Sequence, residues 1–276
     1  PAEVARIFKA VPDANVLKIF LSLPADDQVR VFPYLDEKAQ AKILGSIPDT
    51  SAGFILNHLS SDDRTTILSH LRGVSLSHAL SLLEGSKKDV SHDILGYPEN
   101  SVARILNTDF ASVNGESTIA EASDHLRHHH RDNETANVIY VVDGEGRLVD
   151  DIPIRRLVLN DPGKRVRDVM DGFVTKLNIR DSKEDAVAKF KEYDRVALPV
   201  TNDDNVLLGV VTVDDVLDIA EEKDTAEIQK FGGVEELDYP YVKTPIVSLL
   251  KKRAGWLIIL FLGEMFTATA MGYFDK

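Results

Sequence analysis

The chain has 276 residues, which is long enough for more than one domain, because a single uninterrupted core of that size is unusual. Its composition, with 43% hydrophobic and 28% charged residues, is that of a globular protein and argues against wholesale disorder. The net charge of −13 argues against a nucleic-acid-binding surface, which needs clustered lysine and arginine. The absence of cysteine excludes disulfides and thiolate metal sites, and it suits a reducing cytoplasm.

An apolar repeat with a period of twelve residues runs through the first part of the chain. Its two apolar positions lie three residues apart and are occupied by Phe8 and Val11, Phe20 and Leu23, Phe32 and Leu35, Leu44 and Ile47, Leu56 and Leu59, Leu68 and Leu71, and Leu80 and Leu83. Residues at this spacing share one helix face, and the proline, aspartate or serine behind most pairs ends one helix and begins the next. Because a two-turn helix cannot bury its stripe alone, the sequence predicts an all-α solenoid of short helices over residues 1–100, with these residues as core.

The pattern changes after the solenoid, where one module occurs twice. Residues 138–142 and 196–200 are strand-like runs. Each is followed by a turn, a second strand and a helix, and these following parts match at an offset of 59 residues, as Leu148 does with Leu207. The upstream parts match at a different offset because the first copy carries an insertion around residues 128–132. We therefore predict a strand-helix-strand-strand-helix module over 101–162 and again over 163–222. The duplicated pattern resembles a tandem pair of CBS domains, which gives an α plus α/β architecture.

The second copy contains a candidate nucleotide site. The CBS resemblance implies that, after a glycine-containing strand, Thr212 and Asp215 bind the sugar and phosphate of an adenine nucleotide such as ATP. A hydroxyl and a carboxylate at the start of a helix can bracket these groups. The alternative is that Thr212 merely caps the helix. The first copy has Asp150 and Asp151 where the pattern needs glycine and an apolar residue, so we expect no nucleotide there.

The end of the chain is predicted to be a membrane span. An apolar run over residues 254–276 follows the basic residues 251–253 and is long enough to cross a bilayer. The positive-inside rule then places residues 1–250 in the cytoplasm, with Trp256 at the interface. Residues 223–253 would form a connecting, plug-like helical region. Glu264 in the middle of the span would have to face protein or water. The alternative is a buried amphipathic helix.

The order of these parts is a helical solenoid, a CBS pair, an acidic helix, a basic flank and a span. Together with residues 97–101, residues 211–218 and the span around Trp256, this order resembles the MgtE family of magnesium channels and transporters over essentially the whole chain. The resemblance implies a multi-pass protein of the cell (inner) membrane and a homodimer formed through the CBS domains. It also implies a cytoplasmic part that senses intracellular Mg2+ and closes the pore.

Carboxylates on the solenoid, on the second copy and on its following helix are the candidate Mg2+ ligands. They are Asp62, Asp63, Glu184, Asp194, Asp215, Asp218, Glu221 and Glu222. Asp215, Asp218 and Glu222 follow a spacing that puts them on one helix face. Carboxylates crowded across an interface repel one another, and a hard dication with oxygen ligands removes that repulsion. Ion binding would therefore stabilise the compact, closed state. The alternative is that these acids form a solvated face.

Four positions depart from the family pattern. Asn100 stands where the join between the solenoid and the CBS pair usually has aspartate, and Asp150-Asp151 replaces a glycine and an apolar residue. Arg195 occupies a place where an apolar or aromatic side chain could stack on adenine, and Lys223 interrupts the acidic helix. These departures bear on nucleotide binding and on the number of Mg2+ sites rather than on the family.

A histidine cluster lies at the insertion in the first copy. Its members are His125, His128, His129 and His130. His125 and His129 have the i, i+4 spacing of a transition-metal pair, but Arg127 and Arg131 lie beside them and disfavour a dication. We interpret the cluster as solvated surface.

The sequence gives little support to an enzyme. It has no nucleophile elbow, no phosphate-binding loop with lysine and no zinc-protease motif, so we expect no catalytic residues. The favoured function is a Mg2+-sensing gate of a magnesium channel or transporter. The alternative is a CBS module that senses an adenine nucleotide for another membrane protein. A third interpretation is a membrane-anchored scaffold, which would bind neither ligand.

Overall fold

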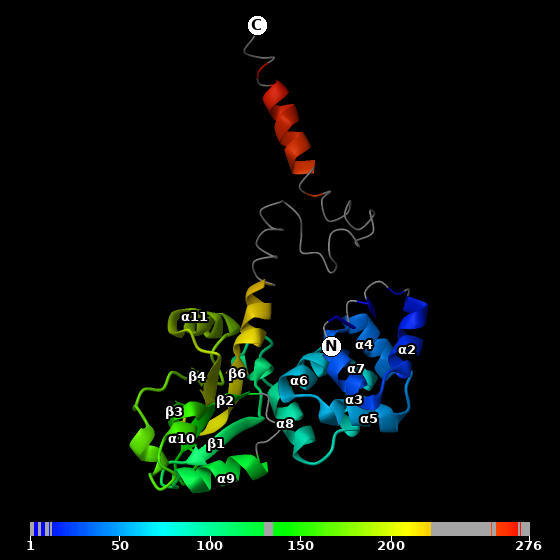
Figure 1. The fold of residues 1–276 in the computed structure, drawn as a ribbon. Coiled ribbons are helices and arrows are strands. Elements are labelled where there is room, and N and C mark those ends of the chain that lie inside the picture. The colour runs from blue at the N-terminus through cyan, green and yellow to red at the C-terminus, as the bar shows by residue number, and fades with distance from the viewer. Residues whose placement is uncertain are drawn as a thin grey trace. The chain divides into compact units, whose positions relative to one another are not determined.

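A computed structural model of the chain describes residues 3–4, 7–8, 11, 13–129, 135–221, 255, 258–269 and 271 (Figure 1). The chain divides into two compact units, Pro1–Val216 and Leu217–Lys276. The first unit contains the helical solenoid and the strands of both repeats, and it is described first.

The N-terminal part is all-helical, as the twelve-residue repeat predicts. Its elements are α2 (Asp13–Ser22), α3 (Ala25–Val31), η1 (Phe32–Tyr34), α4 (Glu37–Leu44), α5 (Asp49–His58), α6 (Ser61–His70), α7 (Gly73–Ser81) and α8 (Ser86–Leu95). Pro24 and Pro48 stand directly before α3 and α5. Asp36 and Ser60 cap α4 and α6 by accepting hydrogen bonds from backbone N–H groups. The residue behind each apolar pair therefore sets where the next helix begins.

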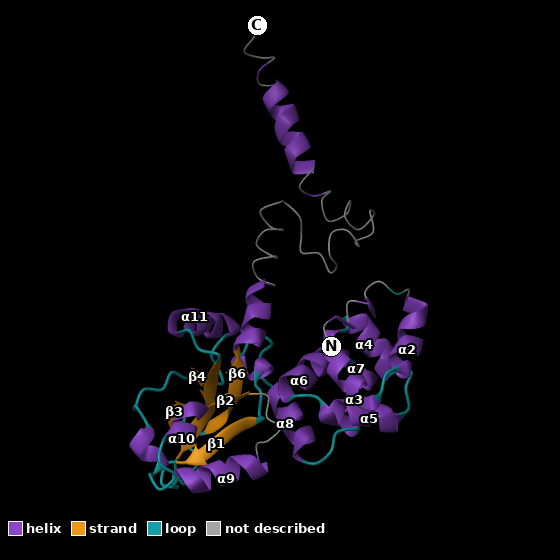
Figure 2. Cartoon of the chain, in the orientation of Figure 1, coloured by secondary structure: helices purple, strands orange, loops and turns teal. Residues whose placement is uncertain are grey.

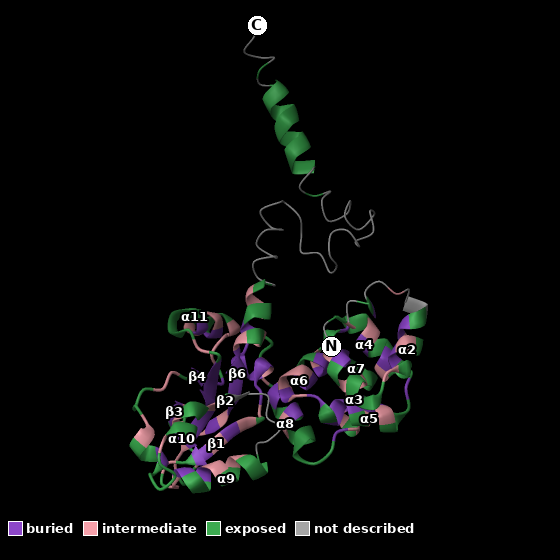
Figure 3. Cartoon of the chain, in the orientation of Figure 1, coloured by how far each residue is buried: buried purple, intermediate pink, exposed green. Residues whose placement is uncertain are grey.

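The repeated apolar residues form the core of the solenoid, which confirms their predicted role. Phe20, Phe32, Leu56 and Leu68 are completely buried, and Figure 3 shows buried positions along the stacked helices. The ring of Phe20 lies 6.5 Å from that of Phe8 and 5.8 Å from that of Phe32, centroid to centroid. Side chains one repeat apart therefore pack directly on each other.

The two predicted modules form two small sheets of the same topology (Figure 2). The first has β1 (Phe110–Asn114), α9 (Ile119–His129), β2 (Thr135–Val142), β3 (Leu148–Pro153) and α10 (Ile154–Leu159), and the second has β4 (Leu177–Asn178), α11 (Lys183–Tyr193), β5 (Ala197–Thr201), β6 (Leu207–Thr212) and a helix over residues 213–221. In each sheet the first pair of strands is parallel and the second antiparallel. The register is also the same: Tyr140 opposes Asp151 as Pro199 opposes Val210. Both members of the second pair lie 59 residues after the first, which confirms the duplication.

The two repeats contact each other through the turns that follow β2 and β5. The Leu148 amide donates to the Asn205 carbonyl at 2.9 Å, and the Leu207 amide donates to the Gly146 carbonyl at 3.0 Å. Behind these bonds, Tyr140 and Val210 join the two leucines in a buried cluster. The repeats therefore share an interface that includes two reciprocal hydrogen bonds and an apolar core.

The segment between the solenoid and the first repeat packs on the second repeat. It contains η2 (Val102–Ile105), and its Asn107 forms an antiparallel bridge with Val210 of β6. This approach depends on Gly209, because a Cβ there would lie 2.5 Å from the Asn107 carbonyl oxygen. The solenoid is thereby connected to the second repeat, although the first repeat follows it in sequence.

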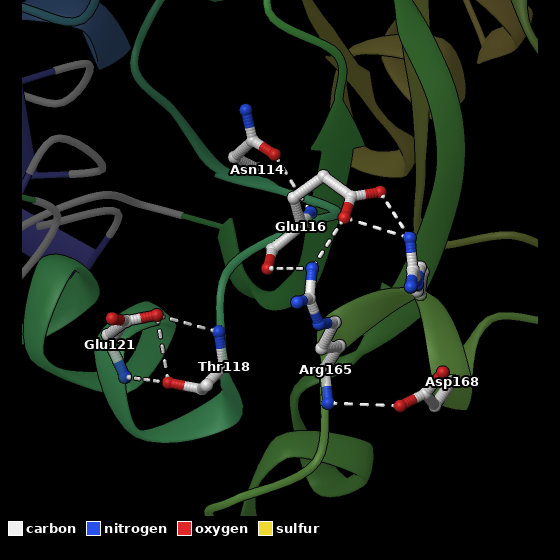
Figure 4. Close-up of polar contacts among 7 residues, drawn as sticks. Asn114, Glu116, Thr118, Glu121, Arg165 and Asp168 are labelled. Carbon is white, nitrogen blue, oxygen red and sulfur yellow. Dashed lines mark hydrogen bonds and ion pairs between the residues drawn. The ribbon is translucent and has the colours of Figure 1, made fainter.

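The connection between the repeats, which includes η3 (Val166–Val169), is attached to the first repeat by charged side chains (Figure 4). Glu116 accepts from Arg165 and from Arg167, each at 2.7 Å. Nearby, the hydroxyl of Thr118 donates to Glu121 at 2.9 Å and accepts from the Glu121 amide, which caps the start of α9. These contacts are solvent-exposed, so they fix the path of the loops more than they add stability.

In the second unit, residues 258–269 are helical. Within the described part of the chain, no helix is both long enough and apolar enough to cross a membrane. The connecting region 223–253, with its basic residues, and Trp256 lie outside the described residues. The span over 254–276, including the role given to Glu264, therefore stays a prediction.

Candidate functional site

Four carboxylates gather where the solenoid meets the second repeat. Asp62 and Asp63 occupy the first turn of α6, and Asp214 and Asp215 occupy the first turn of the helix over residues 213–221. The carboxylate of Asp215 interacts electrostatically with Asp62, Asp214 and Asp63. The fold therefore brings together three of the predicted ligands and Asp214, which lies beside one of them.

Hydrogen bonds from Ser61 place α6 at this junction. The Ser61 hydroxyl donates to the Leu106 carbonyl at 3.0 Å and accepts from the Thr108 amide at 2.7 Å. Ser61 is 1% exposed, so neither bond is shared with solvent. Because Ser61 is hydrogen-bonded to the segment that packs on the second repeat, the neighbouring Asp62 and Asp63 lie close to that repeat.

Thr212 places the other side of the site. It ends β6, and its hydroxyl donates to the Asp215 carboxylate at 2.6 Å. A short bond to a charged acceptor is strong, and it holds the Asp215 side chain in one orientation. These are the two residues predicted to bind nucleotide. In the described structure they bind each other, and nucleotide binding stays a prediction.

Burial and mutual repulsion disfavour the charged forms of these acids. The pKa of Asp215 is raised to about 8, mainly by burial and then by the charge of Asp62, while the bond from Thr212 lowers it. Burial likewise raises the pKa of Asp62. The Oδ1 atom of Asp62 is buried, and it has no hydrogen-bond partner among the described residues. The site thus has acceptor capacity that the described residues do not use, as a cation site requires.

The positively charged side chain of Arg64 lies beside these acids. Arg64 is 3% exposed, and it donates to the Leu59 carbonyl at 3.0 Å and to the Ser91 hydroxyl at 3.2 Å. Its charge interacts with Asp109 and Asp62, while burial lowers its pKa. Sequence reasoning missed Arg64 because an arginine in a polar helix is usually at the surface. It also missed Asp214, whose only signal was its position directly before Asp215.

The remaining predicted ligands are not among these four carboxylates. Glu184 accepts a hydrogen bond from the amide of Asn100 at 2.8 Å, and Asp194 is the left-handed residue that ends α11, with φ 49°. Asp218 and Glu221 belong to the second unit, and Glu222 lies outside the described residues. No group of three or more histidine, aspartate or glutamate side chains is arranged to hold a metal ion within the described ranges.

The histidine cluster lies on the exposed surface of α9. The rings of His125 and His129 stack at 4.6 Å, and His130 lies outside the described residues. The interpretation as solvated surface stays a prediction.

The raised pKa of Asp215 gives a testable pH dependence. Because the folded pKa exceeds the unfolded one, the folded state binds the proton more tightly, and stability is lost as pH rises through about 8. We expect urea denaturation without divalent ions to show falling stability from about pH 4 to about pH 8, and Asp215→Asn to flatten that slope. Asp204→Asn, in an exposed turn, is the matched control. An unchanged slope in Asp215→Asn would exclude this carboxyl as its source.

Comparison with known proteins relates this architecture to others. The MgtE intracellular N domain matches residues 1–100, and the CBS domain matches residues 102–163 and 166–222. A magnesium transporter MgtE of Thermus thermophilus is 34% identical over 180 residues, which cover 65% of this chain and 40% of that protein. One of Enterococcus faecalis is 32% identical over 185 residues, with coverages of 67% and 40%. The chain thus spans 40% of the length of these curated relatives.

Two solved structures share the fold. The cytosolic domain of the Mg2+ channel MgtE in complex with ATP matches with a TM-score of 0.60 at 25% identity, over 78% of this chain and 93% of that one. The soluble part of a magnesium transporter matches with a TM-score of 0.63 at 27% identity, over 80% and 92%. The N-domain match, the two CBS matches and these structures follow one order along the sequence, and the chain belongs to the MgtE family.

Proposed function

We propose that this chain is the Mg2+-sensing regulatory part of a magnesium channel or transporter. The observation that carries the proposal is the meeting of Asp62 and Asp63 with Asp214 and Asp215, with one buried oxygen of Asp62 lacking a partner among the described residues. Relatives named as magnesium transporters support the choice of ion. Mg2+ prefers oxygen ligands and often keeps several of its waters, so a few carboxylates suffice.

The proposed mechanism is a difference in ion affinity between two arrangements. Without Mg2+, the ionised carboxylates of Asp62 and Asp215 repel each other, and this repulsion both raises the pKa of Asp215 and weakens the contact between the solenoid and the second repeat. Bound Mg2+ cancels that repulsion and stabilises the docked arrangement by its greater affinity for it. In a homodimer joined through the CBS domains at the cytoplasmic face of the cell membrane, docking would hold the pore closed. The sequence spacing of Asp215, Asp218 and Glu222 makes the latter two further candidate ligands, and Glu221, Glu184 and Asp194 stay candidates as well.

A nucleotide-sensing role is the second candidate. A relative of known structure was solved in complex with ATP, and Thr212 and Asp215 stand at the start of a helix in the second repeat. Because the Asp215 carboxylate serves both proposals, nucleotide and Mg2+ would compete for it or share it. A sensor of this kind in another membrane protein would bind nucleotide and ignore Mg2+.

The test is limited proteolysis of the chain across a Mg2+ titration, with ATP added in a parallel series. We expect protection to rise at millimolar Mg2+, and we expect the double variant Asp215→Asn/Asp218→Asn to lose most of that protection. The reason is that these residues share a helix face and one of them interacts with Asp62.

The control is Asp26→Asn/Asp27→Asn, which removes the same charge from exposed positions of α3 and should respond to Mg2+ as the unmodified chain does. Equal loss in both double variants would indicate a general charge effect. Protection by ATP with no effect of Mg2+ would favour the nucleotide sensor instead.

A further inference from the structure

A polar group of three residues, distinct from the four carboxylates described above, lies between the two repeats. Tyr140 and Asp151 are cross-strand neighbours on β2 and β3, so their side chains emerge on the same face of the first sheet. Arg195, just beyond α11 in the second repeat, donates to Asp151 Oδ2 at 3.0 Å. The side chain of Asp151 is 5% exposed, whereas that of Arg195 is 33% exposed. One end of this ion pair is therefore buried and the other reaches solvent.

At the buried end of the ion pair, two polar atoms lack hydrogen-bond partners among the described residues. Asp151 Oδ1 and the Tyr140 hydroxyl are both buried, and neither has a hydrogen-bond partner among the described residues. Tyr140 is completely buried in the apolar cluster that joins the repeats. A buried polar atom without a partner costs free energy, and a buried ion pair seldom returns the full cost of desolvating its charges. The polar group therefore weakens the interface that it occupies.

Other charges around Asp151 add to that cost. Asp150, also on β3, is completely buried and accepts hydrogen bonds from the amides of Asp171 and Gly172. Arg156 on α10 pairs with Asp171 at 2.6 Å. Burial raises the pKa of Asp151; Arg195 and Arg156 lower it, while Asp150 and Asp171 raise it further. Three carboxylates thus face two guanidinium groups.

The duplication shows that the fold does not need this group. At an offset of 59 residues, Tyr140 corresponds to Pro199, Asp151 to Val210 and Arg195 to Ala136. Val210 is completely buried in the same inter-repeat cluster. The second repeat builds the equivalent strand pair with apolar residues, Pro199 and Val210.

We propose that Tyr140, Asp151 and Arg195 form a proton-sensitive release point between the two repeats, which is held shut when Asp151 is protonated and loosened when Asp151 is ionised. The sign follows from linkage. The closed interface penalises the ionised carboxyl relative to an open, solvated one, so closure takes up a proton and weakens as pH rises. The ion pair with Arg195 partly offsets the cost of the ionised Asp151 carboxylate, so the interface is weakened but not lost.

Hydrogen exchange of the two amides that bond across the interface measures how often the interface between the repeats opens. Exchange of the Leu148 and Leu207 amides requires the interface to open, whereas the Ile179 amide bonds within the second repeat and serves as the internal reference. We expect Asp151→Val/Arg195→Ala, which installs the residues of the other repeat, to raise protection at the two reporter amides about tenfold at neutral pH. Arg195→Met, which leaves the carboxylate without its counter-charge, should lower it.

The pH dependence separates a release point from an ordinary stabilising ion pair. In the unmodified chain, protection at Leu148 relative to Ile179, corrected for intrinsic exchange, should fall as pH rises from about 4.5 to about 8. Asp151→Asn should remove that fall, and Arg195→Met should extend it to higher pH. Reduced protection in Asp151→Val/Arg195→Ala would overturn the proposal, because the pair would then hold the repeats together. Unchanged pH dependence in Asp151→Asn would also overturn it.

Discussion

Replacing Gly209 with alanine is expected to destabilise the first unit by about 3 kcal/mol or more. A Cβ at this position would lie 2.5 Å from the Asn107 carbonyl oxygen and 2.6 Å from Leu106 Cδ1. One of these atoms is backbone, and it accepts a hydrogen bond from Val210, so it cannot move without breaking the bridge to β6. The measurement is the free energy of unfolding by urea, read from helical and tertiary signals together.

The matched control for that substitution is Gly144→Ala. Gly144 lies in the turn after β2, where a Cβ would meet nothing within 4 Å. We expect its effect to stay within about 0.5 kcal/mol. Because Ser61 binds both Leu106 and Thr108, Gly209→Ala should also loosen the solenoid from the second repeat and reduce Mg2+-dependent protection. Equal stability of the two glycine variants would show that the segment 101–108 can move away from β6 at little cost in free energy.

Truncating Phe32 to alanine is expected to cost about 3–5 kcal/mol. Its side chain is completely buried at the junction of α3 and η1, and its ring lies 5.8 Å from that of Phe20. The stacked helices are short, so no neighbour can move far enough to fill the cavity. The loss should appear as a lower midpoint in urea with an unchanged slope.

Tyr34→Ala is the control for the solenoid core. Tyr34 lies two residues further along η1 and is 53% exposed, so its truncation should change stability by well under about 1 kcal/mol. If the two variants lost equal stability, the twelve-residue apolar repeat would not mark the core. That result would contradict the stacking derived from the sequence.

The local parts of this fold were predictable because each depends on nearby residues. The proline and capping residues set the helix starts, and Phe20, Phe32, Leu56 and Leu68 recur at the period of the stack. The duplication was readable because both copies keep the same strand register. Periodicity reports which face of an element is buried, but it does not report which distant element covers that face.

The candidate site was predictable only in part, because it joins residues that lie far apart in the sequence. The sequence marked Asp62, Asp63 and Asp215 as candidates, but it does not show that the bonds of Ser61 to residues 106 and 108 hold α6 on the connecting segment. Glu184 and Asp194 had the same chemistry, and the fold gives them other neighbours, Asn100 and the end of α11.

The sequence alone determined the architecture, the family and the kind of side chain that would matter, since these follow from local spacing and composition. Only the tertiary structure decided which charges meet: Asp62 with Asp215, and Asp151 with Arg195. It also showed that Gly209 is needed for close packing against Asn107. Burial and mutual distance set the free energy of a charge, and both are properties of the folded chain rather than of any segment.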